Sequence, residues 1–366
     1  MATNKIKVAI AGIGFGKKVH MPALENCEEL ELTGLYHPTK KISELNITDP
    51  KIKMFNNWDD LITSSEIQAL IIATPPSIRF KLAQEAIAKG KHLLLEKPVC
   101  LEASQIKTLQ KQAILTGVSV GVDFEYRAVP IFKQAKMVID NGLLGKIWMA
   151  KLDWIMNSRA DETREWNWYS QEQEGGGVLG SLGTHAFDIL HWLIGKTSKA
   201  SGILSTSIKK RRDRNSNNDK EVTSDDVCFA NLELLNKAND SKIPTQISLS
   251  SISRNGSGFS LEIYGSEGSL SLGSDNQKDY VHGFGLWVSQ KNNGLKKIEP
   301  NDEFLFKRTW SDGRIAPVAA IQKEWAESIR NKSPMIPGLT EAYISQSVCD
   351  AIKESSLTGI SQTIKF

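Results

Sequence analysis

The stretch that decides the fold is IKVAIAGIGFG, which occupies residues 6–16. Its first six residues are mostly Val, Ile and Ala, which is typical of a strand buried on both faces. In the glycine-rich loop that follows, Gly12 allows a tight turn and Gly14 lets a pyrophosphate approach the backbone. A helix after this loop would offer unpaired N–H groups and a positive dipole end to the anion. The stretch therefore predicts a dinucleotide-binding loop.

This loop departs from the G-x-G-x-x-G fingerprint in one place. The third glycine should fall at residue 17, which is Lys17, whereas Gly16 comes one position early. An ordinary strand–helix turn is therefore the alternative interpretation. The position of the loop after a first strand favours cofactor binding. The predicted cofactor contacts in the loop are Gly12, Ile13, Gly14, Phe15 and Gly16.

Strands and helices alternate through the first third of the chain. Further apolar stretches rich in Val, Ile and Leu occupy residues 30–36, 69–76, 91–98 and 118–124. Helical stretches lie between them, and two of these end at Gly90 and Gly117. Such alternation predicts an α/β domain with a doubly wound parallel sheet, which we place at residues 1–124.

The pattern changes after about residue 125. The expected elements are a helix at 131–145, a long strand at 146–156, a helix at 178–195, several β-like segments between 200 and 290, and helices at 317–333 and 339–359. This order predicts an α+β domain on a mostly antiparallel, open sheet, at residues 125–366. The last helices of this domain can pack back on the first domain.

The composition argues against several classes of protein. The formal net charge of +3 over 366 residues gives no reason to expect a nucleic-acid partner. The four cysteines stand far apart without a CxxC pair, which argues against a disulfide scaffold or a zinc site. No apolar run approaches the roughly 20 residues that a membrane-spanning helix needs. We therefore expect a soluble cytoplasmic protein without a metal or a membrane partner.

The end of the second predicted strand bears on the choice of cofactor. NAD-binding proteins usually carry an acidic residue there for the ribose 2′-hydroxyl, and the segment 35–41 has none. Thr39, Lys40 and Lys41, with His37 if it is protonated, would instead suit a 2′-phosphate. A solvated basic loop is the alternative. The sequence favours NADP over NAD.

Several motifs together resemble the Gfo/Idh/MocA family, named for glucose–fructose oxidoreductase and inositol dehydrogenase. They are the glycine loop, ATPP at 73–76, EKP at 96–98, GGGVLGSLGTHAFD at 175–188 and the helical tail at 337–359. The resemblance covers almost the whole chain. It implies a Rossmann domain, and a C-terminal α/β domain whose sheet packs against a partner subunit in a homodimer or homotetramer.

The resemblance also implies a function: an NAD(P)-dependent oxidoreductase acting on a sugar, polyol or related carbonyl compound. By the same analogy, the cofactor is lined by Ala73, Thr74 and Pro75, and the nicotinamide ribose and reacting carbon lie near Glu96 and Lys97. Tyr126 and Arg127, just past the last strand of the first domain, are expected on the substrate side.

Lys97 and His185 are the predicted catalytic residues. Oxidising an alcohol requires removal of the hydroxyl proton as the hydride leaves. A lysine beside a cationic nicotinamide is pushed towards its neutral form, and histidine titrates near neutrality, so both side chains suit that task. The alternatives are a structural lysine before a proline turn and a core histidine.

Ser181 marks a departure from the resemblance. The family often has an aspartate four residues before this histidine, where Ser181 stands here. The change leaves room for a different substrate, a reductase direction, or a non-catalytic NAD(P)-binding sensor. We include Ser181 among the substrate-side residues. Asp188 joins them, with a helix-surface position as its alternative.

Overall fold

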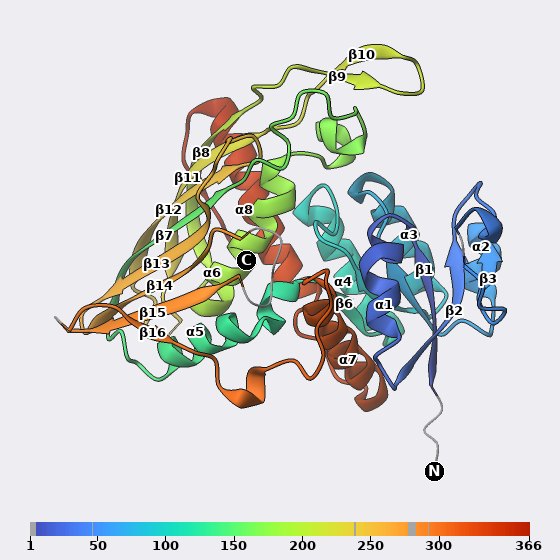
Figure 1. Cartoon of the computed structure of the whole chain (residues 1–366), viewed down its shortest axis with the longest axis horizontal. Coiled ribbons are helices and arrows are strands. Elements are labelled where there is room, and N and C mark those ends of the chain that lie inside the picture. The colour runs from blue at the N-terminus through green and yellow to red at the C-terminus, as the bar shows by residue number, and fades with distance from the viewer. Residues whose placement is uncertain (1–4, 46, 238, 277–282, 292) are drawn as a thin grey trace. The chain divides into compact units, whose positions relative to one another are not determined.

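A computed structural model describes residues 5–45, 47–237, 239–276, 283–291 and 293–366. The chain forms two compact units (Figure 1). The first comprises Met1–Glu125 with Trp310–Tyr343, and the second comprises Tyr126–Thr309 with Ile344–Phe366. Within the described part of the chain, no helix combines the length and the apolar character needed to cross a membrane.

A parallel sheet of six strands forms the centre of the first unit, in the order β3-β2-β1-β4-β5-β6. The strands are β1 Ile6–Ala11, β2 Leu30–Tyr36, β3 Lys53–Phe55, β4 Ala69–Ile72, β5 His92–Leu95 and β6 Val120–Val122. The order turns back at β1, so the switch point for a ligand lies at the carboxyl ends of β1 and β4. This confirms the predicted doubly wound sheet. No pattern in the sequence indicates β3, because three residues are too few to show a period.

Helices cover this sheet. They are α1 Met21–Leu24, α2 Trp58–Thr63, α3 Pro76–Ala88, α4 Ala103–Thr116 and α7 Ile315–Asn331. Pro76 starts α3, where its missing N–H has no helical partner to lose. Gly117 ends α4 in the left-handed conformation that favours glycine. Helix α7 returns from late in the sequence, and its Ile315 and Val318 pack with Val19 and Ala23.

The second unit is built on a nine-stranded sheet, ordered β16-β15-β14-β13-β7-β12-β11-β8-β17. Its strands are β7 Ile147–Ile155, β8 Thr197–Ser205, β11 Val227–Leu235, β12 Lys242–Ser250, β13 Gly258–Gly265, β14 Gly268–Ser274, β15 Gly285–Gln290, β16 Lys296–Ile298 and β17 Gln362–Thr363. Neighbouring strands are antiparallel except β7 and β12. The mostly antiparallel sheet is as predicted. A separate ribbon joins β9 Lys210–Asp213 to β10 Asn218–Glu221.

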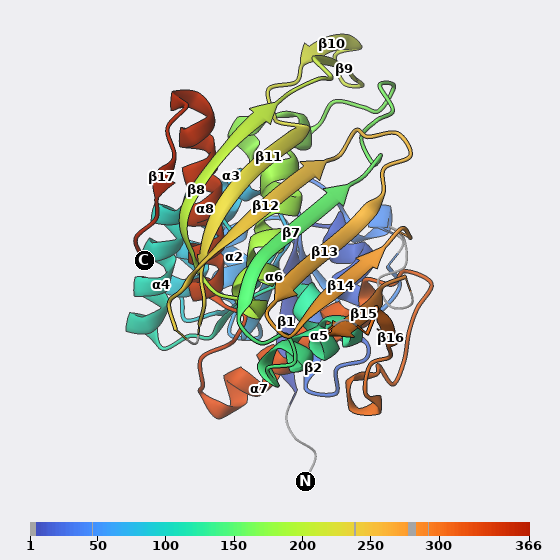
Figure 2. The same cartoon turned by 90° about the vertical axis from the view of Figure 1, so that its left-hand side faces the viewer.

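One face of the large sheet is covered and the other is open. Helices α5 Pro130–Asp140 and α6 Thr184–Leu193, with the later turns of α8 Leu339–Thr358, pack on the covered face. Alternation along β7 points Leu152 and Trp154 into this core. The uncovered face is turned to the viewer in Figure 2. It presents exposed large side chains such as Ile203, Phe229 and Tyr264.

Candidate active site

The glycine loop uses each of its glycines differently. A Cβ on Gly12, whose φ is +99°, would lie 2.5 Å from the Ala73 carbonyl group, so only glycine lets these backbones approach. A Cβ on Gly16 would lie 2.7 Å from the Ile10 side chain. The early glycine therefore provides the close helix–strand packing expected of the third glycine, in a helix that opens with a π-helical turn, Gly16–His20. A Cβ on Gly14 would meet no atom within 4 Å.

In the loop after β2, the side chain of His37 holds a backbone turn. Its Nδ1 accepts hydrogen bonds from the backbone N–H groups of Thr39 (3.2 Å) and Lys40 (3.1 Å). Burial, and then the charge of Lys40, lowers the pKa of His37. The ring is therefore an acceptor that holds the turn, and a contact of His37 with the cofactor stays a prediction. The positive charges of this loop are the exposed Lys40 and Lys41.

Arg79 joins the two loops that carry the ATPP and EKP motifs. This side chain comes from α3 and is only 3% exposed. Its guanidinium donates to the carbonyl oxygens of Thr74, Glu96 and Pro98. Burial lowers the pKa of Arg79 to about 10, and the charge of Glu96 opposes that shift. No motif singles out Arg79, although its position three residues after ATPP places it one turn into the helix.

Glu96 is held by a buried histidine that no sequence motif singles out. The amide nitrogen of Gln322 donates to Nδ1 of His20 at 3.2 Å and to the His20 carbonyl oxygen at 3.1 Å. Since Nδ1 accepts, the ring proton lies on Nε2, which donates to Glu96 Oε1 at 2.8 Å. The same Nε2 lies 3.6 Å from Oδ2 of Asp123.

These ligand atoms of His20, Glu96 and Asp123 all lie within 4.8 Å of one another, a spacing that a metal ion could also use. The hydrogen bonds of His20 account for the arrangement without an ion. No other such group of three occurs among the residues that the structure describes.

The carboxyl groups around Lys97 differ in their tendency to ionise. Burial raises the pKa of Asp123 well above its ordinary value, and the charges of Glu96 and Glu125 raise it further. Burial raises the pKa of Glu125 to about 7, although the charge of Lys97 lowers it. Asp123 therefore favours its protonated form more than an exposed aspartate does, and Glu125 titrates close to neutrality.

Glu96 carries the negative charge of this cluster. Burial alone would raise its pKa, but the hydrogen bond from His20 lowers it. The positive charges of Lys97 and Arg79 act in the same direction, so the pKa of Glu96 lies below its ordinary value. Lys97 therefore follows a fixed carboxylate along the chain, and its own backbone N–H donates to Glu96 Oε2 at 3.2 Å.

His185 lies in the second unit, near the start of α6. A π-helical turn, Leu179–Gly183, leads into this helix. His185 is 3% exposed, and its ring packs edge-on against Tyr126, with ring centroids 4.9 Å apart. It also packs against the tilted ring of Trp154, with centroids 6.2 Å apart. Aromatic packing therefore holds the imidazole.

Ser181 is engaged by a tyrosine. Its Oγ donates to the Gly177 carbonyl oxygen at 2.8 Å and so accepts the hydrogen bond from the Tyr169 hydroxyl at 2.9 Å. Burial raises the pKa of Tyr169, so the phenol keeps its proton at neutral pH. The position of the family aspartate thus contains a neutral Tyr–Ser pair.

Two of the predicted substrate-side residues bind each other. Arg127 Nε donates to Asp188 Oδ2 at 2.8 Å, and its Nη2 donates to Oδ1 at 2.6 Å. Asp188 is 2% exposed, so its helix-surface alternative is wrong. A bidentate, buried pair of this kind fixes α6 against the segment before α5. A role of either residue in substrate binding stays a prediction.

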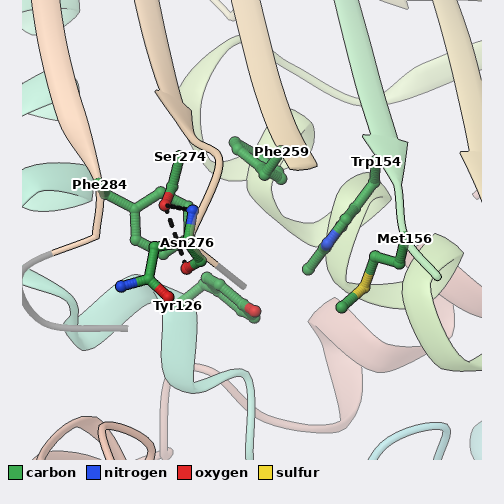
Figure 3. Close-up of a pocket in the computed structure, with 7 residues that line it drawn as sticks. All are labelled: Tyr126, Trp154, Met156, Phe259, Ser274, Asn276 and Phe284. Atoms are coloured by element: carbon green, nitrogen blue, oxygen red, sulfur yellow. Dashed lines mark hydrogen bonds between the residues drawn. The ribbon is translucent and has the colours of Figure 1, made fainter. Parts of the chain in front are cut away.

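Tyr126 borders a small cavity whose other walls are Trp154, Met156, Phe259, Ser274, Asn276 and Phe284 (Figure 3). Its volume of about 10 Å³ accommodates one water molecule at most and no sugar ring. Substrate contact by Tyr126 therefore stays a prediction, and the ring itself is 2% exposed.

The six-stranded parallel sheet and its glycine loop are typical of a dinucleotide-binding Rossmann domain, and the second unit is built on an open sheet. The chain belongs to the Gfo/Idh/MocA oxidoreductase family. Residues 6–124 match the family model described as "NAD-binding Rossmann fold", and residues 136–364 match the one described as "C-terminal alpha/beta domain".

Individual relatives span the whole chain. An uncharacterized oxidoreductase of Synechocystis sp. is 39% identical over 352 residues, covering 96% of this chain and 94% of its own. The glucose-6-phosphate 3-dehydrogenase of Bacillus subtilis is 26% identical over 353 residues, covering 95% of each. A solved complex of levoglucosan dehydrogenase with NADH and levoglucosan superposes on this chain with a TM-score of 0.84. The match covers 98% of this chain and 99% of that one at 20% identity, which shows a shared fold.

The different surroundings of two glycines predict different consequences for alanine. Gly14→Ala should leave the melting temperature unchanged, because its Cβ meets no protein atom, and should weaken NADH or NADPH binding by roughly tenfold or more. Gly12→Ala, strained by φ and by the Ala73 backbone, should lower the free energy of unfolding by about 2–4 kcal/mol. Differential scanning fluorimetry and cofactor titration measure both. Wild-type cofactor affinity in Gly14→Ala contradicts the assignment.

Proposed function

We propose that the protein is an NAD(P)-dependent dehydrogenase or reductase acting on a CH–OH group of a sugar, polyol or related carbonyl compound. The observation that carries this proposal is the Glu96-Lys97-Pro98 loop at the carboxyl end of β5, fixed by Arg79 and His20. The relatives named as glucose-6-phosphate 3-dehydrogenase and levoglucosan dehydrogenase support the substrate class. In this proposal residues 1–124 bind the cofactor, and residues 125–366 bind substrate and mediate self-association.

The first unit fits a dinucleotide. Gly14 leaves open space above the loop, at the switch point of the sheet, where a pyrophosphate needs close access to the backbone. The loops that include Ala73, Thr74 and Pro75 and the EKP motif end neighbouring strands β4 and β5, so they share the same sheet edge. When bound, the nicotinamide supplies the hydride acceptor or donor.

The protein side chains supply the proton chemistry in this proposal. Lys97 hydrogen-bonds the reacting oxygen and takes its proton when the alcohol is oxidised. His185 acts as the acid–base partner, and the roles reverse in reduction. The hydrogen bond from His20 favours the anionic form of Glu96. Glu96 accepts a hydrogen bond from the backbone N–H of Lys97 and places a negative charge next to that residue. Glu125 can hold or release a proton near neutral pH, because the pKa of its buried carboxyl group is about 7.

Lys97→Ala tests the catalytic assignment. We expect kcat to fall by about 10²–10⁴-fold, since proton transfer to the reacting oxygen is lost, with NAD(P)H affinity within about twofold of wild type. Turnover of a panel of sugars, polyols and their oxidised forms, with energy transfer from tryptophan to bound nicotinamide, measures both. The matched control is Lys81→Ala on the exposed side of α3, which should change neither.

Undiminished turnover in Lys97→Ala would refute the role of Lys97. If the wild-type protein binds the cofactor but turns over none of the panel, the alternative of a non-catalytic NAD(P)-binding sensor replaces the enzyme. Ser181, bonded by Tyr169 in place of the family aspartate, is the feature that favours this alternative.

NADP is the cofactor that we propose, because Lys40 and Lys41 are exposed beside the end of β2 and Thr39 offers a hydroxyl. Wild type should bind NADPH more tightly than NADH. Replacing Lys40 and Lys41 together by alanine should weaken NADPH binding by about tenfold and leave NADH unchanged, since only NADPH carries the 2′-phosphate. Fluorescence titration measures this, with the exposed Lys51→Ala as control. Tighter NADH binding by wild type would reverse the cofactor assignment without affecting that of Lys97.

We propose a homodimer or homotetramer formed through the open face of the large sheet. Ile203 and Phe229 pair across β8 and β11 and are 69% and 55% exposed on this face. Light scattering of the 40.6 kDa chain should give an oligomer, and the double variant Ile203→Glu with Phe229→Glu should give a monomer. Ile114→Glu, on an equally exposed isoleucine of α4 in the first unit, is the control. A monomeric wild type would refute the proposal.

A further inference from the structure

Arg159 lies in the segment between β7 and α6 and differs from the arginines around it. Its guanidinium carbon lies 3.8 Å from the centroid of the Tyr169 ring. Among the described residues, no oxygen accepts a hydrogen bond from the Arg159 side chain. By contrast, Arg211 donates to three backbone carbonyl groups, and Arg164 donates to the Ser158 carbonyl oxygen at 2.6 Å. The donors of Arg159 are therefore available to a ligand.

None of the described groups whose charge acts on the pKa of Arg159 is a carboxylate. The side chain is only partly exposed, and burial lowers the pKa of Arg159 to about 10. Tyr169 opposes this shift, while the positive charges of Arg164 and Arg211 add to it. The group remains a cation at neutral pH, in a surrounding of like charge. A guanidinium that has no acceptor among the described residues and is only partly exposed suits an oxyanion, which can accept its hydrogen bonds and balance its charge.

The segment holds Arg159 in place before any ligand arrives. Its backbone N–H donates to the Ser251 carbonyl oxygen at 2.7 Å, and its own carbonyl oxygen accepts from Arg211 at 2.6 Å. The stacking partner Tyr169 is fixed as well, since its carbonyl oxygen accepts from the Ser224 hydroxyl at 2.8 Å. A pre-positioned, planar donor group loses little conformational freedom on binding.

Tyr169 connects this arginine to the helix of the predicted acid–base residue. Its ring stacks on Arg159, and its hydroxyl donates to Ser181. Ser181 lies in the π-helical turn that leads into α6, four residues before His185. Arg159, Tyr169, Ser181 and His185 all belong to the second unit, to which we assign substrate binding.

We propose that Arg159 binds an anionic group, a phosphate or a carboxylate, on the sugar or polyol that the protein acts on. This inference rests on the proposed function and narrows its substrate class to anionic sugars. The guanidinium fork matches the paired oxygens of either group, and Tyr169 sets the plane of the fork by stacking. Arg159 is thus a specificity-determining residue rather than a proton carrier.

Binding measured without turnover tests this proposal separately from the enzymatic one. Isothermal titration of the full-length protein, saturated with its cofactor, would compare D-glucose 6-phosphate, D-glucuronate and D-glucose. At least one anionic sugar should bind wild type about 10- to 100-fold more tightly than glucose. The stronger of the two distinguishes phosphate from carboxylate.

Variants assign the preference to the residue. Arg159→Gln should reduce the affinity for the preferred anionic sugar to that for glucose, with the affinity for glucose unchanged. Arg159→Lys, which keeps the charge but loses the fork, should fall between Arg159→Gln and wild type. The matched control is Arg212→Gln on the β9–β10 ribbon, where Arg212 already bonds Asn217 and Asp219; it should behave as wild type.

Three outcomes overturn the proposal. Glucose could bind as tightly as both anionic sugars, none of the three sugars could bind, or the preference could survive in Arg159→Gln. In each case NAD(P)H binding and turnover of a neutral substrate would leave the proposed oxidoreductase function standing. A wild-type melting temperature for Arg159→Gln shows that any loss of binding is not a loss of folding.

Discussion

A single buried guanidinium determines how the first unit presents its loops. Arg79 directs its hydrogen bonds to backbone carbonyl groups after β4 and after β5, so two loops that are distant in sequence share one donor. Each buried carbonyl group left without a partner would cost about 1–3 kcal/mol. The position of Lys97 in space therefore depends on a residue of α3 that cannot itself take part in the chemistry.

The second constraint is electrostatic. Glu96 lies 2.8 Å and Asp123 3.6 Å from the same His20 nitrogen, and two neighbouring buried carboxyl groups cannot both ionise at moderate cost. The hydrogen bond from His20 lowers the pKa of Glu96, whereas burial and the charge of Glu96 raise the pKa of Asp123. Because Glu125 titrates close to pH 7, the charge near Lys97 changes within the physiological range.

Local sequence patterns predict much of the fold, whereas contacts between residues that are distant in the sequence cannot be predicted from such patterns. The strand–glycine–helix order of residues 6–16 and the alternation after it predicted the parallel sheet, because buried strands and helix ends leave local signatures. The contacts that hold Glu96 leave no such signature: His20, which donates to Glu96, is 302 residues from Gln322, which donates to His20, and the two meet only in the fold. The turn that His37 holds is equally hidden, since it depends on backbone N–H groups rather than on a side-chain pattern.

Helix α7 has a consequence for synthesis on the ribosome. The helix supplies Gln322, which fixes the proton of His20, and Ile315, which packs on the first helices. It is translated only after nearly all of the second unit has been made. Domains generally fold in order of their emergence from the ribosome. Here the nascent Rossmann sheet must wait, with part of its apolar surface uncovered, until residues 310–343 have been made.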